Sequence, residues 1–72
     1  MKYYFSISLT AEEFRPYYRG KVANIVVTTT QGQRLKFPAM HARKYVTHTG
    51  IHGHFCMETK NNKFVSLTKI SN

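Results

Sequence analysis

The clearest structural pattern in this chain lies in residues 2–20, which read KYYFSISLTAEEFRPYYRG. Apolar and polar side chains alternate from Lys2 to Leu9, which is the period of a strand with one buried face. Thr10 and Glu13 then have the spacing of a capping box, in which each side chain bonds the backbone N–H of the other residue. The stretch therefore predicts a strand that leads directly into a helix.

The predicted helix is short. Its first turn carries Glu12 and Glu13, and because the helix dipole favours carboxylates there, we interpret this pair as structural and not as catalytic. Pro16 removes a backbone hydrogen bond beyond the first turn, and Gly20 suits a C-terminal cap. The helix is therefore expected to be short or distorted near its end.

The middle of the chain predicts a β-hairpin. Residues 21–30 are rich in Val, Ile and Thr, which is typical of a strand, and residues 33–37 form the return strand. A two-residue turn at Gln31-Gly32 would place Val26 opposite Phe37 on one face. The other face would then also carry apolar residues, which suggests that the hairpin bends into a small barrel-like sheet.

The second half of the chain predicts one or two helical turns over residues 39–46 and strands over residues 51–59 and 63–70, the last two joined by an Asn61-Asn62 turn. The predicted fold is α+β: a small, mostly antiparallel β-sheet or partial barrel of about five strands. One short helix follows the first strand, and a helical turn precedes the fourth. Residues 1–72 are expected to form a single domain.

The composition favours a binding protein. Eleven Lys and Arg oppose three acidic residues, giving a formal net charge of +8, which attracts polyanions such as nucleic acid. The alternative is that this charge only keeps a small protein in solution. A lone cysteine, Cys56, fits a reducing compartment. We recognise neither a signal peptide nor a membrane span, so we expect a cytoplasmic protein that does not bind membranes.

Histidine spacing raises the question of a metal site. His52, His54 and Cys56 would project from one face of a strand, a row that can bind zinc or copper. A strand face presents three ligands poorly, however, so we expect neither a metal nor another cofactor. A Cys–His pair would have only Glu58 to orient it, and the glycines form no phosphate-holding loop. We therefore predict a protein that is not an enzyme and has no small-molecule substrate.

Basic side chains occur beside aromatic ones at several places in the sequence. Such neighbours can hold phosphates and stack the bases of a single strand. The residues that we predict to bind nucleic acid, here called the basic set, lie on the return strand of the hairpin, on the helical turn and at the end of the first helix. They are Arg34, Lys36, Arg43, Lys44, Arg19 and Lys21.

Two further expectations compete with this interpretation. Tyr17, Tyr18 and Tyr45 lie where a thin core needs bulk, so most of their rings are expected to be buried. The strand that starts at Lys2 and the strand that ends at Ile70 are candidate sheet edges, where another chain can add a strand. The alternative function is therefore a protein-interaction or homodimerisation module that uses a sheet edge and the His48–Gly53 loop.

Several residue strings resemble a known family. They are Tyr3-Tyr4-Phe5-Ser6, Ala11-Glu12-Glu13-Phe14, Tyr17-Tyr18 with Gly20, Phe37-Pro38-Ala39, and Thr47-His48 with Gly50-Ile51-His52-Gly53-His54-Phe55. On these strings the chain is similar to domain-of-unknown-function family 2835, which comprises short uncharacterised proteins of gammaproteobacteria. The resemblance implies a small stand-alone domain and brings no activity, cofactor or partner. It directs attention to His48, Gly50, His52 and Gly53, as either a tight turn or a ligand loop.

Overall fold

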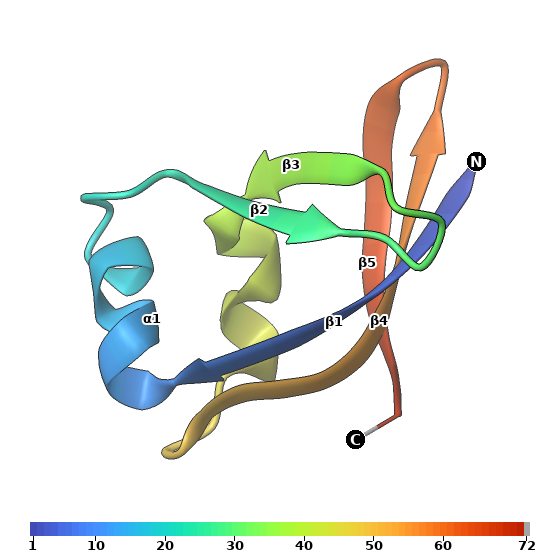
Figure 1. Cartoon of the computed structure of the whole chain (residues 1–72). Helices are drawn as coiled ribbons and strands as arrows, with labels where there is room; N and C mark the ends of the chain where they lie inside the picture. Colours follow the sequence, from blue (N-terminus) through green and yellow to red (C-terminus); the bar gives the residue numbers. More distant parts are fainter. Residues whose placement is uncertain (72) are drawn as a thin grey trace.

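The computed structural model describes residues 1–71, which form five strands and two helices (Figure 1). In chain order these are β1 (Lys2–Thr10), α1 (Ala11–Tyr18), β2 (Asn24–Thr28), β3 (Arg34–Pro38), the 3₁₀ helix η1 (Ala39–Tyr45), β4 (Gly50–Lys60) and β5 (Lys63–Ser71). All the strand pairs are antiparallel, in a sheet of order β1-β4-β5 and a separate β2-β3 sheet. The predicted α+β fold and its element order are confirmed, and the strands of residues 1–71 do not close into a barrel.

Local signals set both ends of α1. The predicted capping box is present, because Glu13 N–H donates to Thr10 Oγ1 at 3.1 Å and Thr10 N–H donates to Glu13 Oε1 at 2.9 Å. Gly20, with φ of +78°, closes the other end. Its N–H and that of Lys21 donate to carbonyls of the last helical turn, which is the Schellman arrangement. The helix is eight residues long, as short as predicted.

The register of the β2–β3 hairpin differs by one residue from the prediction. Ile25, not Val26, pairs with Phe37. Ile25 and Phe37 are 3% and 2% exposed, whereas Val26 is 51% exposed and pairs with the exposed Lys36. The predicted register was therefore wrong, and the apolar side chain on the outer face, Val26, is exposed to solvent. Strand β2 is also shorter than the predicted 21–30.

The length of the hairpin loop explains this shift. Thr29 N–H donates to the Gln33 carbonyl at 2.8 Å, which leaves three residues between them instead of the predicted two. Gly32 takes a φ of +84°, the left-handed conformation in which three-residue hairpin loops usually end. One added loop residue changes the face to which every side chain of the return strand belongs.

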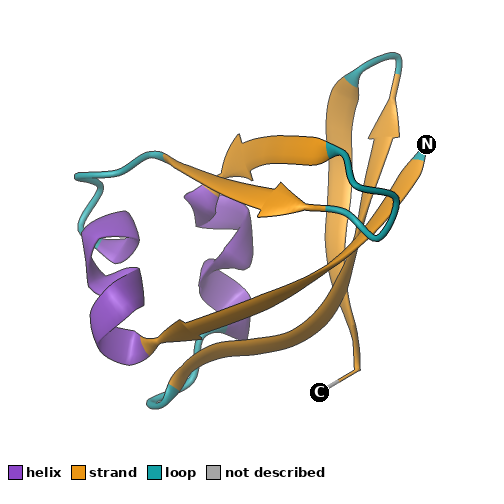
Figure 2. Cartoon of the chain, viewed as in Figure 1, coloured by secondary structure: helices purple, strands orange, loops and turns teal. Residues whose placement is uncertain are grey.

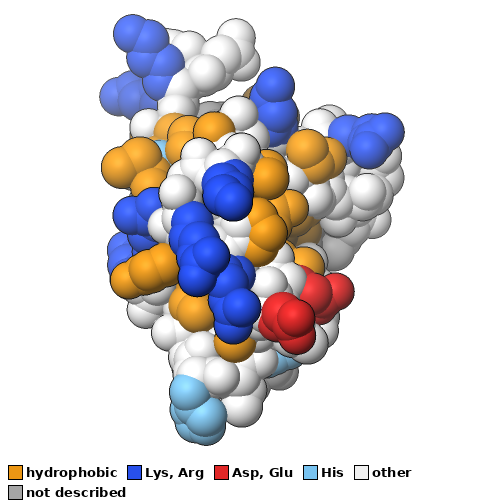
Figure 3. All heavy atoms as spheres, turned by 90° about the vertical axis from the view of Figure 1, so that its left-hand side faces the viewer, with side chains coloured by type: hydrophobic (Ala, Val, Ile, Leu, Met, Phe, Trp, Pro, Cys, Tyr) orange, Lys and Arg blue, Asp and Glu red, His pale blue; other side chains and the backbone are white. Residues whose placement is uncertain are grey.

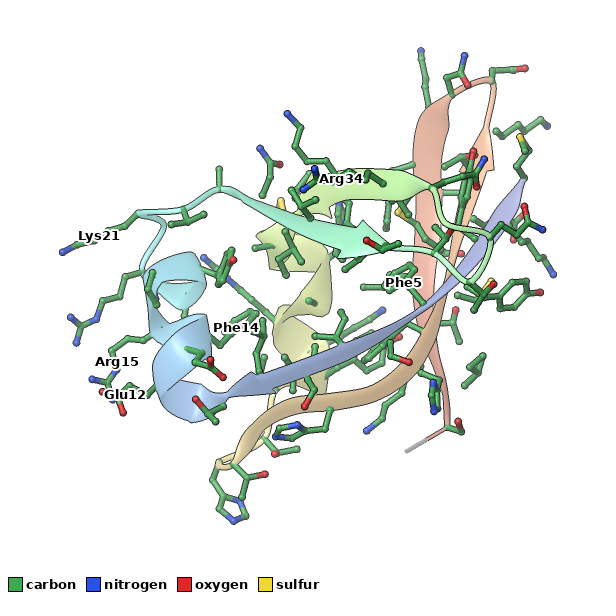
Figure 4. The ribbon with its side chains drawn as sticks, in the orientation of Figure 1. Phe5, Glu12, Phe14, Arg15, Lys21 and Arg34 are labelled. Atoms are coloured by element: carbon green, nitrogen blue, oxygen red, sulfur yellow. The ribbon has the colours of Figure 1, made fainter. Side chains whose placement is uncertain are left out.

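The core lies between the two sheets and against the helices. Phe5 of β1 packs on Phe55 of the neighbouring β4, with ring centroids 6.3 Å apart, and on Phe37 of the other sheet at 5.7 Å. Figure 4 shows Phe5 and Phe14 pointing into the interior, while Arg15 points outward from α1. The buried apolar residues are Phe5, Ile7, Phe14, Ile25, Phe37, Ala39, Ala42, Ile51, Phe55, Met57 and Leu67.

The two sheets meet at one corner. Thr30 N–H donates to the Tyr4 carbonyl at 2.8 Å, and from this point β1 and β2 diverge toward α1 (Figure 1). Figure 2 shows α1 at one end of the molecule and the β4–β5 hairpin projecting at the other. Neither helix in residues 1–71 is long and apolar enough to cross a membrane.

The hairpin register predicts opposite results for two neighbouring substitutions. Ile25→Ala should lower the free energy of unfolding by about 3 kcal/mol, because it leaves a cavity in the core. Val26→Ala should change it by only about 0.5 kcal/mol, because that side chain is exposed. Urea unfolding followed by circular dichroism measures both changes. A larger loss of unfolding free energy for Val26→Ala than for Ile25→Ala would support the register of a two-residue loop instead.

Candidate functional site

The basic set falls into two groups in the structure. Arg34 and Lys36 extend from the exposed face of β3. The other members are Arg19 and Lys21, which follow α1, and Arg43 and Lys44 on η1; all are exposed. Because α1 and η1 pack against each other, this second group lies at the helical end of the molecule.

Arg43 connects η1 to the end of α1. One of its guanidinium nitrogens, Nη2, donates to the Tyr18 carbonyl at 3.1 Å, and Cζ lies 5.3 Å from the centroid of the Tyr18 ring. A cation is favourable here because the last carbonyls of a helix lack partners within the helix. Tyr17 and Tyr45 are partly buried, but Tyr18 is 62% exposed, so the expectation that most of these rings are buried does not hold for Tyr18. An exposed ring therefore lies directly against a guanidinium group.

Positive charge gathers around this contact. Figure 3 views the α1 end of the molecule and shows Lys and Arg side chains in a column, with hydrophobic side chains between them and acidic ones at one side. Arg15 and Lys21 point outward at this end, and Glu12 lies in the first turn of α1 (Figure 4). The capping role of the helix start thus holds acidic charge away from the Arg43–Tyr18 contact.

A groove of about 390 Å³ runs between η1 and β5. The ring of His41 is stacked on Phe64, with centroids 3.7 Å apart and planes 11° from parallel. The groove is lined by Met40, His41, Arg43 and Lys44 from η1 and by Phe64–Leu67 from β5. Arg43 therefore contacts Tyr18 and also lines the groove, so one side chain joins two aromatic surfaces. Neither His41 nor Phe64 stands out in the sequence, because no local pattern shows that η1 packs beside β5.

The loop singled out by the family resemblance forms a tight turn. Thr47 and Gly50 exchange backbone hydrogen bonds of 2.7 and 3.0 Å. Gly50 has a φ of +118°, and a Cβ placed on it would lie 2.1 Å from the Leu9 carbonyl oxygen. A Cβ on Gly53 would lie 2.6 Å from the Ser71 carbonyl oxygen. Backbone packing therefore explains both glycines, while His48 is exposed in the turn itself.

The two histidines that follow this turn, His52 and His54, face β1. His54 Nδ1 lies 2.7 Å from Ser6 Oγ, and His52 Nδ1 lies 3.2 Å from Ser8 Oγ. These are cross-strand pairs of β1 and β4. Within residues 1–71, no three His, Cys, Asp or Glu side chains lie together as a group that could hold a metal ion. The side chains of His52 and His54 thus link two strands.

The two predicted edge strands are the edges of the three-stranded sheet, but they differ in character. The outer side of β5 is partly covered, since Tyr45 OH donates to the Leu67 carbonyl at 2.7 Å. Strand β5 also carries two register shifts against β4 and has Lys63 and Lys69 along its length. Bulges and lysines of this kind protect an edge from pairing with another chain. The outer side of β1 instead faces β2.

These features define a small α+β domain of two antiparallel sheets, with a basic end on which the ring of Tyr18 is exposed. The family model described as "Protein of unknown function (DUF2835)" matches residues 1–70, and the chain belongs to this family. The resemblance noted from the sequence is thereby confirmed. Searches of curated proteins and of solved structures gave no match.

Replacing Gly50 should be far more damaging than replacing Gly20. Gly50→Ala places a Cβ against the backbone of the β1–α1 junction and should lower the free energy of unfolding by more than about 3 kcal/mol. Gly20 also has positive φ, but a Cβ added there would meet no atom within 4 Å, so Gly20→Ala should cost only about 1 kcal/mol. Thermal unfolding compares them, and equal losses would show that close packing at residue 50 is unimportant.

Proposed function

We propose that this protein is a non-catalytic cytoplasmic module that binds single-stranded nucleic acid at its helical end. The proposed surface, here called the helical-end surface, comprises Arg19, Lys21, Arg43 and Lys44 together with the rings of Tyr18, His41 and Phe64. The single observation that carries the proposal is the position of Arg43, which contacts an exposed tyrosine ring and also lines the groove beside a stacked aromatic pair.

The charge of the surface supports a polyanionic partner. Two of the three acidic residues of the chain, Glu12 and Glu13, are in the first turn of α1, while the four cationic side chains of the surface lie beyond its other end and on η1. Each phosphate that a Lys or Arg neutralises releases counterions, so such binding weakens as salt concentration rises. Arg34 and Lys36 form the other group of the basic set, on the exposed face of β3, and lie outside the proposed surface.

The exposed ring of Tyr18 and the partly buried rings of the groove favour a single strand over a duplex. Bases stack on aromatic side chains only when they are not paired inside a helix, and stacking is tolerant of sequence. Tyr18 and the groove rings offer separate positions for bases, and the guanidinium between them is placed to meet the intervening phosphate. We therefore expect little sequence preference and a weak affinity at physiological salt.

Two pairs of exposed lysines allow the surface to be tested with variants that lose the same amount of charge at different places. The variant Lys21→Gln/Lys44→Gln should bind single-stranded RNA and DNA more weakly than the wild type, and the salt slope of log K should fall by about 0.7 for each lysine. Lys60→Gln/Lys63→Gln removes the same charge from the β4–β5 hairpin and should retain most of the affinity. Fluorescence anisotropy across a salt series measures both, with duplex DNA as a third probe.

Either of two results would contradict the proposal. If no probe binds even at low salt, the net positive charge serves only to keep the protein in solution. Equal losses from both lysine pairs would indicate attraction to net charge without a defined surface.

Tyr18 should contribute through its ring. Tyr18→Ala should reduce the affinity for single strands by roughly tenfold, since base–aromatic stacking is worth about 1–3 kcal/mol, and should leave the salt slope unchanged. Tyr4→Ala, which removes an exposed tyrosine from the outer face of the three-stranded sheet, is the matched control. If both substitutions had the same effect in the anisotropy assay, stacking at the end of α1 would be excluded.

A further inference from the structure

Two strand edges face each other where the sheets diverge. Beyond the Thr30–Tyr4 hydrogen bond, a groove of about 290 Å³ separates β1 from β2. Its walls are residues 6–9 of β1 and residues 25–28 of β2, and Tyr17 of α1 lines it as well. We call this space the edge groove. It is separate from the helical-end surface, whose groove lies between η1 and β5.

The direction of the β1 backbone groups follows from its register with β4. Met1 and Thr59 exchange both backbone bonds, at 2.6 and 2.8 Å, and the register continues without a shift from Lys2 to Thr10. In an antiparallel ladder such pairs alternate with pairs whose N–H and C=O groups point away from the partner strand. The outward-pointing residues are therefore the even-numbered ones, Ser6 and Ser8 among them. The Tyr4 carbonyl agrees, because it bonds Thr30 and not β4.

The backbone groups of β2 alternate in the same way. Thr29 N–H bonds the Gln33 carbonyl on the β3 side, so the alternating residues Val26 and Thr28 direct their backbone groups away from β3. Thr30 N–H, which reaches Tyr4, has the same parity. The ladders of residues 1–71 thus leave two rows of donors and acceptors facing the edge groove without a strand partner.

The unpaired backbone N–H and C=O groups of a strand edge can form hydrogen bonds with an added strand. The side chains define what such a strand would carry. Toward the interior it would meet apolar residues, of which Ile7, Ile25 and Tyr17 line the groove. On the outer face its neighbours across β2 are Arg34 and Lys36, and those across β1 are His52 and His54. Among the described residues that line the edge groove, none is acidic.

We propose that the edge groove binds an extended segment of a partner protein, in which acidic side chains alternate with apolar ones. The segment forms a strand between β1 and β2, bonded through its backbone to Ser6 and Ser8. Its apolar side chains face the interior, and its acidic side chains face the positive charge contributed by β3. This partner and this surface are additional to the proposed nucleic-acid binding.

A proline substitution tests the backbone bonds selectively. Ser8→Pro removes an N–H that points to the groove and leaves the β4 ladder intact, and proline is tolerated at such edge positions. Ser8→Ala is the matched control, since it also loses the contact with His52 but keeps the N–H. The probe is a short fluorescent peptide in which glutamate alternates with valine. Ser8→Pro should weaken its binding at least about tenfold relative to Ser8→Ala, the equivalent of one or two backbone hydrogen bonds.

Two modified peptides test the same point on the wild-type protein, whether or not Ser8→Pro folds. Lysine in place of glutamate should abolish binding, and N-methylation of alternate residues, which removes backbone donors, should do so as well. Amide chemical shifts of Ser6, Ser8, Val26 and Thr28 should change on titration with the unmodified peptide.

Three outcomes would overturn the proposal: no binding of the unmodified peptide, undiminished binding of the N-methylated peptide, or equal affinities of Ser8→Pro and Ser8→Ala. The single-strand anisotropy assay on Ser8→Pro separates the two proposals. If Ser8→Pro folds, its affinity for single-stranded RNA should match that of the wild type even though its affinity for the peptide is reduced. A peptide that binds only through charge would instead compete with RNA at the helical-end surface.

Discussion

The packing of Phe5 on Phe37, with ring centroids 5.7 Å apart, is the contact on which the rest of this small structure depends. The two residues belong to different sheets, and each is almost completely buried. A two-stranded hairpin alone is at best marginally stable in water, so β2 and β3 persist because this contact and Ile25 bury their inner face. The backbone bond from Thr30 to Tyr4 fixes the corner at which the sheets meet. Because no other backbone hydrogen bond within residues 1–71 joins β1 to β2, the two strands remain apart elsewhere and leave the edge groove.

The distribution of charge follows from the small size of the domain. A domain of this length has little interior, and most of its side chains lie at the surface. Two of its three carboxylates stabilise the start of α1, which leaves the far end of that helix with cations alone. Arg43 stabilises the fold there by bonding the Tyr18 carbonyl, and this same bond holds its guanidinium against the exposed ring. Structural and binding roles therefore coincide in one side chain.

Features encoded by neighbouring residues were predicted from the sequence. The capping box, the alternation of β1 and β4, and the Asn61-Asn62 turn each depend on contacts within a few positions; both asparagines take positive φ, as a two-residue hairpin turn requires. The hairpin register was missed because Gly32 is compatible with both two- and three-residue loops. The exposure of Tyr18 and the stacking of His41 on Phe64 depend on how η1 packs against α1 and β5, and no local pattern contains that information. The basic set was identified from composition, but its division into two groups was not.

The shape of the edge groove determines which kind of partner could use it. On a flat open edge, a second folded copy can pair with its own equivalent strand, and such edges lead to aggregation. Here the edge of β1 lies opposite the edge of β2 instead of facing open solvent. A second copy would have to bring its own β2–β3 hairpin to this place, where it would collide with the first. An extended segment has no such appendage and can follow the groove from its wide end near α1 to the corner at Tyr4. The arrangement that keeps the two edges from self-association therefore favours a single inserted strand over a homodimer formed through β1.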